Sequence, residues 1–177
     1  MVYCGIDPGQ TGAIVSLSED GKLITVSDFE KDDTGRICPL QIKRVIEAIR
    51  FYHEEKNYIC CLEKSHAMPG QGTVSMFNYG VTYGITLASI SLSEANIQIV
   101  EITPQSWKKE FDLNSNKKLG IVRTKEDSVT AAINLFPSRE NMLRTPKKKG
   151  GYVLKHGRAE ALLMAEYCRR KYGDNKT

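Results

Sequence analysis

Three acidic residues and one histidine occupy positions where side chains can do chemistry. Asp7 ends a short apolar run and is followed at once by proline and glycine, so a strand must stop and turn at this carboxylate. Glu63 ends a second apolar run and precedes a loop that also contains proline and glycine. His156 and Glu160 are four residues apart, so on a helix they would share one face.

These four residues predict a metal site if the fold brings them together. Parallel neighbouring strands end at the same edge of a sheet, which would place Asp7 beside Glu63, and a helix across that edge would add His156 and Glu160. Converging carboxylates repel one another, and hard divalent cations relieve that repulsion. Two such ions about 3.5–4 Å apart can clamp the attacking and leaving oxygens of a phosphodiester displacement. The simpler alternative is that Asp7 only begins a turn, where aspartate is common.

Composition narrows the class of protein. The 177 residues are enough for one domain with a sizeable core, and the hydrophobic fraction of 41% is ordinary. No apolar run approaches the roughly 20 residues of a membrane helix, and the N-terminus lacks the pattern of a secretory signal. Five cysteines without a C-x-x-C pair disfavour a disulfide framework or a zinc site. We therefore expect a single-domain intracellular protein in a reducing compartment, without a membrane partner.

Turn residues and apolar periodicity predict an α/β chain. Strands are expected at 2–7, 13–17, 23–29, 58–62 and 97–102, the first three as an antiparallel meander because their connections are short. Helices are expected at 40–56, 73–91, 103–108, 124–136 and 157–172. The segment 112–123 is expected to be a flexible basic connection, and the polar tail 173–177 to fray.

The helix expected at 73–91 carries apolar residues together with two glycines four residues apart, Gly80 and Gly84. That spacing gives a face able to pack closely, either against a partner helix or, more simply, against the core of the same chain.

Positive charge is concentrated near the C-terminus. The net charge is only +4, but residues 139–158 contain one acid and the bases Arg139, Arg144, Lys147, Lys148, Lys149, Lys155 and Arg158. Such a patch suits a polyanion such as nucleic acid, although a solvated loop is the usual fate of a charge run. We interpret 137–155 as a long basic loop, of the kind that is usually functional or disordered.

Four short motifs occur in order along the chain: GIDPGQTG at 5–12, LEK at 62–64, TPQSWK at 103–108 and GRAEALLMA at 157–165. Together they resemble the motifs of the RuvC-type Holliday-junction resolvases of the RNase H-like superfamily, most closely the phage and plastid branches. The resemblance spans nearly the whole chain.

The resemblance implies an RNase H-like fold with a central mixed five-stranded sheet flanked by helices. It implies a homodimer, formed through the helix at about 74–91, that makes paired nicks in four-way DNA junctions. It assigns Asp7, Glu63 and Glu160 as ligands of Mg²⁺ or Mn²⁺, two ions per active site. Residues 66–77 would face the junction, with Met68 and Phe77 as candidate wedges between unstacked bases. The candidate DNA-binding residues are Met68, Gln71, Phe77, Lys108, Lys117, Lys118, Lys147, Lys148, Lys149, Lys155 and Arg158.

His156 departs from the pattern, because many members of the family carry aspartate there. Imidazole is a poorer ligand than carboxylate for Mg²⁺ and a better one for Mn²⁺. A neutral histidine can also orient or deprotonate water near neutral pH. We predict that His156 ligates the second metal ion or positions the nucleophile; the alternative is a helix-start residue without chemistry.

Two other functions remain open from the sequence. The chain could be a DNA-binding module that keeps the fold without cleaving, an alternative that His156 keeps open. The DPGQTG segment at 7–12 is also similar to the phosphate loop of sugar-kinase and actin-like ATPases, but 177 residues do not supply the second lobe of those enzymes. The expected location is with DNA inside a bacterial or phage-infected cell, an organelle or a viral factory.

Overall fold

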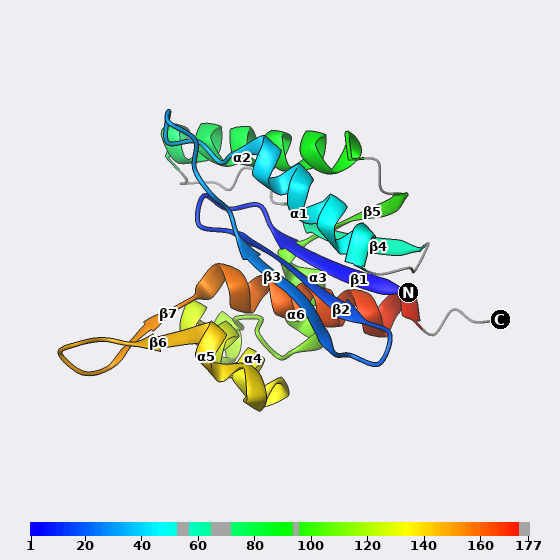
Figure 1. Ribbon diagram of the computed structural model, residues 1–177. Coiled ribbons are helices and arrows are strands. Elements are labelled where there is room, and N and C mark those ends of the chain that lie inside the picture. The colour runs from blue at the N-terminus through cyan, green and yellow to red at the C-terminus, as the bar shows by residue number, and fades with distance from the viewer. Residues whose placement is uncertain (53–56, 65–71, 94–95, 174–177) are drawn as a thin grey trace.

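A five-stranded sheet forms the centre of the computed structural model, which describes residues 1–52, 57–64, 72–93 and 96–173 (Figure 1). Its strands lie in the order β3-β2-β1-β4-β5. The first three are antiparallel neighbours, whereas β4 and β5 run parallel to β1. The predicted mixed sheet, with its antiparallel meander, is confirmed. The strands are β1 (Val2–Asp7), β2 (Ala13–Ser18), β3 (Leu23–Asp28), β4 (Tyr58–Glu63) and β5 (Ile97–Ile102).

Helices cover both faces of the sheet (Figure 1). On one face lie α1 (Pro39–Tyr52) and α2 (Thr73–Ser91), and on the other lies α6 (His156–Gly173), backed by α3 (Pro104–Glu110) and α4 (Lys125–Leu135). Each face has its own apolar core. The shorter elements are η1 (Lys117–Leu119), η2 (Pro137–Arg139), α5 (Glu140–Leu143), β6 (Arg144–Pro146) and β7 (Tyr152–Leu154).

The period of two along a strand decides where the acids of β1 and β4 point. In β1, Cys4 and Ile6 belong to the core under α1 and α2, whereas Tyr3 belongs to the core under α6. Asp7 follows Tyr3 at even spacing and therefore lies on the α6 side. The same alternation in β4 places Glu63 on the α6 side. The register pairs Ile6 with Leu62, so the two acids end adjacent strands.

Two glycines let α6 lie directly on the sheet, close to the end of β1. A Cβ atom on Gly5 of β1 would come within 2.1 Å of the Ala161 carbonyl oxygen. A Cβ atom on Gly157 would come within 2.3 Å of the Thr11 carbonyl oxygen, in the turn that follows Asp7. A larger residue at either position would force the helix away from the carboxylate of β1.

The long basic loop predicted at 137–155 is instead an ordered arm. It contains η2, α5 and the antiparallel hairpin β6–β7, which projects from the body of the protein (Figure 1). The turn is closed by hydrogen bonds between Lys147 and Gly151 and between Gly150 and Lys147, and both glycines have positive φ (84° and 76°). The two strands are only three residues long and lie beside lysines, so the sequence has no alternation of apolar and polar residues that would predict them.

Other expectations also need correction. The segment 112–123 is not an irregular connection, because η1 and a bridge between Asn116 and Ile121 order it. The first turns of α2 do not pack in the core, the simpler of the two interpretations of this helix: Val74 is 74% exposed and Phe77 is 68% exposed. Helix α6 ends at Gly173. Residues 53–56 of the helix expected at 40–56, and residues 174–177 of the expected tail, lie outside the described residues. Among the described helices, none is long and apolar enough to cross a membrane.

Candidate active site

The three predicted carboxylates meet at one edge of the sheet. Asp7 ends β1, Glu63 ends β4, and Glu160 lies in the first turns of α6. Burial raises the pKa of Asp7 to about 7, with the negative charges of Glu160 and then Glu63 adding to the shift. The Gly9 N–H, which donates to Asp7 Oδ1 over 3.0 Å, and the charge of Lys125 act in the opposite direction. The edge is therefore a place where negative charge accumulates.

Glu63 is held in place by an aromatic residue. The indole N–H of Trp107 donates to Glu63 Oε2 over 2.8 Å, and Trp107 is completely buried under α6. The Tyr79 hydroxyl donates to the main-chain carbonyl of Glu63 over 3.2 Å. Both the backbone and the side chain of this acid are thus fixed by neighbouring helices.

Glu160 is approached by a hydroxyl and a cation. Ser128 of α4 donates to Glu160 Oε1 over 3.3 Å, and Lys108 Nζ lies 4.0 Å from the same oxygen. The Lys108 ammonium also lies 5.1 Å from the centre of the Trp107 ring. This lysine therefore brings positive charge to the acidic edge.

His156 begins α6, and its Nδ1 lies 3.2 Å from the Lys125 carbonyl oxygen. A carbonyl only accepts hydrogen bonds, so in the neutral ring this contact places the proton on Nδ1 and leaves Nε2 as the basic nitrogen. His156 also lines a hollow of about 390 Å³ between the turn after Asp7, the end of β3 and the base of the hairpin.

The donor set suits a hard divalent cation in type and charge. Carboxylate oxygens are the ligands that Mg²⁺ and Mn²⁺ prefer, and a cation would reverse the field that disfavours ionised Asp7. Within the described residues, however, no group of three or more His, Cys, Asp or Glu side chains is already gathered into a metal-binding cluster.

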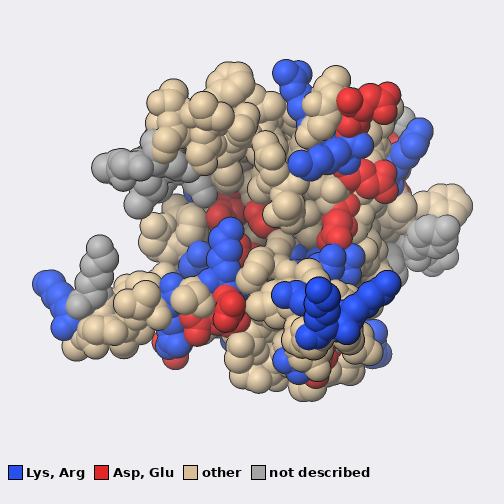
Figure 2. All heavy atoms as spheres, turned by 90° about the vertical axis from the view of Figure 1, so that its left-hand side faces the viewer, with Lys and Arg blue, Asp and Glu red and all other residues tan. Residues whose placement is uncertain are grey.

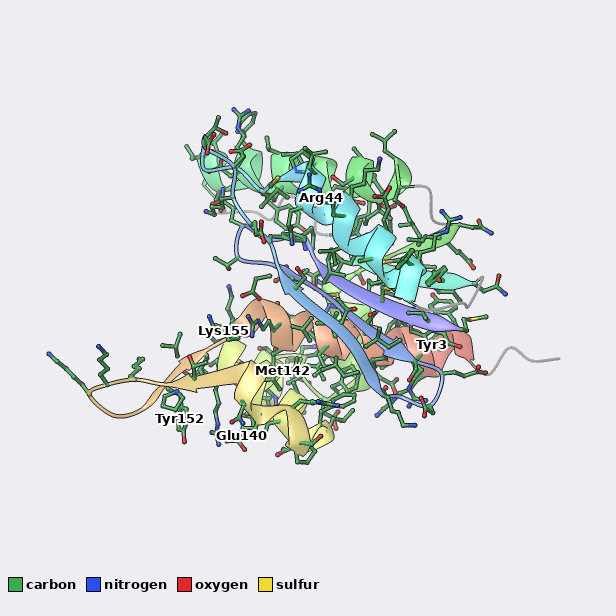
Figure 3. All side chains as sticks on the ribbon, in the orientation of Figure 1. Tyr3, Arg44, Glu140, Met142, Tyr152 and Lys155 are labelled. Carbon is green, nitrogen blue, oxygen red and sulfur yellow. The ribbon has the colours of Figure 1, made fainter. Side chains whose placement is uncertain are left out.

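The candidate DNA-binding residues fall into distinct places. Lys147, Lys148 and Lys149 are exposed at the hairpin tip, and Lys155 lies at the hairpin base beside the hollow (Figure 3). Phe77 and Lys118 are exposed on α2 and η1, away from the hairpin in the sequence. Met68, Gln71 and the side chain of Lys117 lie outside the described residues.

Arg158 has an intramolecular partner. Its Nε and Nη2 donate to the two carboxylate oxygens of Asp28 over 2.6 and 2.8 Å, and its Nη1 donates to the Met142 carbonyl over 3.2 Å. This fork joins the start of α6 to the end of β3 and to α5. The geometry favours a structural role for a residue that the sequence suggested as a DNA contact.

The hairpin is braced at its base. Arg144 forms an ion pair with Glu140 and stacks over the Tyr152 ring at 4.4 Å, and the Lys155 N–H donates to the Leu143 carbonyl over 2.8 Å (Figure 3). On the face shown in Figure 2, acidic side chains lie in a depression near the centre, with lysine and arginine beside and below them. A polyanion approaching this face would meet basic groups around an acidic centre.

Sequence reasoning missed the residues that support the acids, namely Trp107, Ser128 and Lys125. The TPQSWK motif drew attention to residue 107 but not to its partner, since Glu63 is 44 residues earlier in the chain. Ser128 and Lys125 lie in a helix whose apolar stripe alone was recognised.

No protein-family model matches the sequence, and no curated protein matches it closely enough to be significant. Solved structures do match. Thermus thermophilus RuvC bound to a Holliday junction substrate aligns with a TM-score of 0.59 and 14% identity, over 93% of this chain and 90% of that one. The chain has the RuvC fold. A second T. thermophilus RuvC structure aligns with a TM-score of 0.57 and 16% identity, over 97% of both chains.

The yeast mitochondrial Holliday junction resolvase Ydc2 aligns more distantly, with a TM-score of 0.50 and 14% identity, over 96% of this chain and 80% of that one. The RuvC fold thus confirms the RNase H-like architecture expected from the motifs. At these identities the likeness concerns the arrangement of strands and helices.

Proposed function

We propose that this chain is a RuvC-type, metal-dependent and structure-selective DNA endonuclease that resolves four-way junctions, and other branched DNA, by paired nicks. The observation that carries the proposal is the meeting of Asp7, Glu63 and Glu160 at one edge of a RuvC fold, where burial and mutual repulsion raise the pKa of Asp7. An intracellular location in association with DNA follows from that activity.

The acidic residues, His156 and Lys108 would have different roles in the reaction. Asp7, Glu63, Glu160 and His156 would hold two Mg²⁺ or Mn²⁺ ions. When bound, these ions supply activation of a water molecule and charge stabilisation at the leaving oxygen of the phosphodiester. His156 Nε2 is available either to ligate a metal or to accept a proton, because Nδ1 is committed to the Lys125 carbonyl. Lys108 would attract the phosphate group to the acidic edge.

The hairpin tip would contact phosphates away from the reacting group. Changing Lys147, Lys148 and Lys149 together to alanine should flatten the dependence of log K for junction binding on log salt concentration, by up to about 3 if each contacts one phosphate. Such contacts carry no sequence information, so the loss should be uniform across junction sequences. Lys22→Ala, at the exposed turn between β2 and β3, is a single-charge control that should leave the slope unchanged. An unaltered slope in the triple variant would rule out these lysines as contacts.

The exposed face of α2 supports a homodimer. Val74 and Phe77 are apolar and exposed, and a Cβ atom on Gly80 or Gly84 would meet nothing within 4 Å. Apolar residues beside glycines let two helices approach closely, and a dimer would carry two active sites for paired nicks. Replacing Val74 and Phe77 with aspartate should convert a dimer to a monomer in sedimentation velocity.

The decisive experiment compares a synthetic four-way junction with the matching linear duplex, in Mg²⁺, in Mn²⁺ and with a chelator. Paired, metal-dependent nicks confined to the junction support the proposal, and Asp7→Asn should abolish them. Tight junction binding without cleavage in either metal would instead indicate a binding module. The described residues contain no group of three or more gathered metal ligands, which is consistent with that outcome. Binding to neither DNA would contradict both and call for a nucleotide-binding assay of the turn after Asp7.

A further inference from the structure

Helix α3 reaches two of the three candidate carboxylates with consecutive residues. The Trp107 indole N–H donates to Glu63 Oε2 over 2.8 Å, and Lys108 Nζ lies 4.0 Å from Glu160 Oε1. Glu63 comes from the sheet and Glu160 from α6, so this short helix connects acids that belong to different elements.

The indole is fixed by its surroundings. Trp107 is fully buried in the core beneath α6, and the helix that carries it is started by Thr103, whose hydroxyl accepts the Ser106 N–H over 3.3 Å. Indole nitrogen can only donate, and leaving it buried without an acceptor would be costly. Because Trp107 is buried, its indole N–H is held in one place, where it donates to Glu63 Oε2.

We infer that Trp107 is a positioning residue that orients the Glu63 carboxylate to receive a divalent cation. The inference rests on the proposed metal-dependent function and deepens it. A hydrogen bond to one oxygen restricts rotation of the carboxylate about its last torsion, which a purely apolar side chain of similar size would not do. Outer partners of metal ligands commonly contribute 10- to 100-fold in metal affinity or activity.

Trp107 also provides its own probe, because it is the one tryptophan of the sequence. Paramagnetic Mn²⁺ bound beside the indole should quench its fluorescence in a saturable way, and Mg²⁺ in excess should restore the emission. Glu63→Gln should weaken or remove this saturable phase. If electron paramagnetic resonance shows that Mn²⁺ binds while tryptophan emission stays constant, the indole does not lie at the metal site and the inference fails.

The second test removes the N–H and keeps an aromatic ring. Trp107→Phe should lower Mn²⁺ affinity by roughly 10-fold, measured as free Mn²⁺ by electron paramagnetic resonance. The Mn²⁺ concentration for half-maximal junction cleavage should rise by a similar factor, while cleavage at saturating Mn²⁺ recovers toward the wild-type rate. Ile42→Val, a fully buried change in the core on the other face of the sheet, is the control and should leave Mn²⁺ affinity unchanged.

The outcomes separate this inference from the function on which it rests. Unchanged Mn²⁺ affinity in folded Trp107→Phe, judged by circular dichroism, would overturn the positioning role even if the wild-type protein cuts junctions. Mn²⁺-dependent quenching and weakened binding in Trp107→Phe would support it even if no DNA were cut, in which case the proposed nuclease function would fail alone. Should Trp107→Phe not fold, constant tryptophan emission in the wild-type protein while Mn²⁺ binds would still overturn the inference.

Discussion

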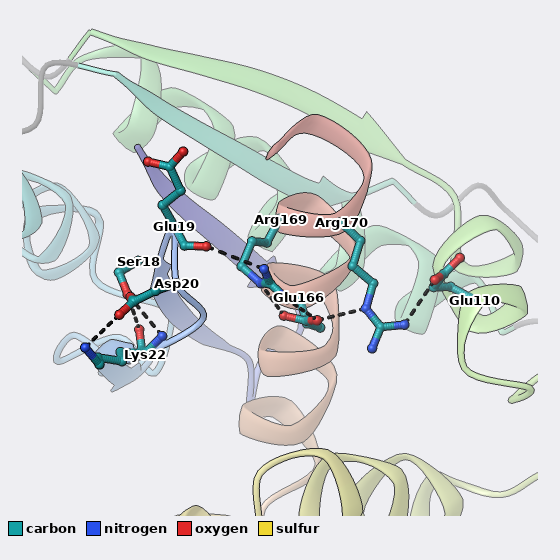
Figure 4. A network of polar contacts seen from close by, with 8 residues as sticks. All are labelled: Ser18, Glu19, Asp20, Lys22, Glu110, Glu166, Arg169 and Arg170. Carbon is teal, nitrogen blue, oxygen red and sulfur yellow. Dashed lines mark hydrogen bonds and ion pairs between the residues drawn. The ribbon is translucent and has the colours of Figure 1, made fainter. Parts of the chain in front are cut away.

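Acidic residues near the two ends of α6 have pKa values shifted in opposite directions. Glu166, in the second half of the helix, is almost fully buried and is clasped by two arginines (Figure 4). Arg169 donates to both of its oxygens over 2.8 and 2.9 Å, and Arg170 donates to Oε1 over 2.8 Å and reaches on to Glu110 over 3.1 Å. Burial would raise the pKa of Glu166, but these hydrogen bonds outweigh it and lower the pKa below its usual value.

At the other end, Asp7 faces Glu160 and Glu63, and within the described part of the chain no arginine donates a hydrogen bond to Asp7. Burial raises its pKa first, and the two neighbouring acids raise it further, to about 7. The nearby cations are lysines: Lys125 lowers this pKa by a smaller amount, and Lys108 lies 4.0 Å from Glu160.

The contrast separates acidic residues that stabilise the fold from acidic residues that lower its stability. A buried carboxylate with hydrogen-bonded guanidinium partners has its charge compensated within the chain. A cluster of like charges costs stability in the absence of a cation, and such clusters concentrate at functional sites. One helix therefore lies between a network whose charges are compensated and an edge of the sheet where like charges repel one another.

The largest expected effect comes from Asp7→Asn. Removal of a carboxylate that we propose to bind metal should lower junction cleavage by about 10³-fold or more, since metal catalysis is worth several kcal/mol. The same change should raise thermal stability without metal, because it removes a half-buried charge and its repulsion with Glu160 and Glu63. Single-turnover cleavage and a thermal melt measure the two effects. A less stable Asp7→Asn protein would mean that like-charge repulsion does not dominate this edge.

The closed network should respond in the opposite way. Glu166→Gln deprives two arginines of their anion and should destabilise the fold by about 2 kcal/mol, the order of hydrogen bonds to charged groups. For a chain of this size that corresponds to a melting temperature lower by about 6 °C. Junction cleavage well below the melting temperature should be unchanged. Glu110→Gln, at the exposed end of the network, is the matched control and should have a smaller effect.

Most of the architecture followed from local patterns. Apolar runs that end on an acid marked β1 and β4, and short connections predicted the meander of β1, β2 and β3, whose second turn contains Gly21 with a φ of +77°. The period of two then sufficed to put Asp7 and Glu63 on one side of the sheet. These signals are readable because each depends on neighbours in the sequence.

What escaped prediction depends on contacts between distant residues or on very short elements. The hydrogen bond from Trp107 to Glu63 spans 44 positions, and the fork between Arg158 and Asp28 spans 130. The hairpin β6–β7 has strands too short for a periodic signal, so its lysines suggested a loop. The environment of Val74 and Phe77 was left open between a core and a partner, because an apolar residue on a helix looks the same in either case.

The pH dependence of stability changes gradually over several pH units and compares the two regions within one experiment. The pKa of Asp7 is raised from 3.8 to about 7, so between about pH 4 and pH 7 the folded protein keeps a proton that the unfolded chain has released. Stability should therefore fall as pH rises through this window, with a slope below the one-proton limit of about 1.4 kcal/mol per pH unit. The pKa of Glu166 is lowered from 4.5, so its contribution is present above that pH and is lost as pH falls below it.

Urea unfolding of the metal-free protein at pH values from 3 to 9 would resolve both limbs. Asp7→Asn should flatten the decline between pH 4 and 7 and leave the acid limb intact, whereas Glu166→Gln should reduce the acid limb alone. Added Mg²⁺ should oppose the decline, since a bound cation favours ionised Asp7 over its protonated form. An Asp7→Asn curve that runs parallel to the wild type between pH 4 and 7 would contradict the assignment of the raised pKa to this residue, and with it the electrostatic contrast between the two ends of α6.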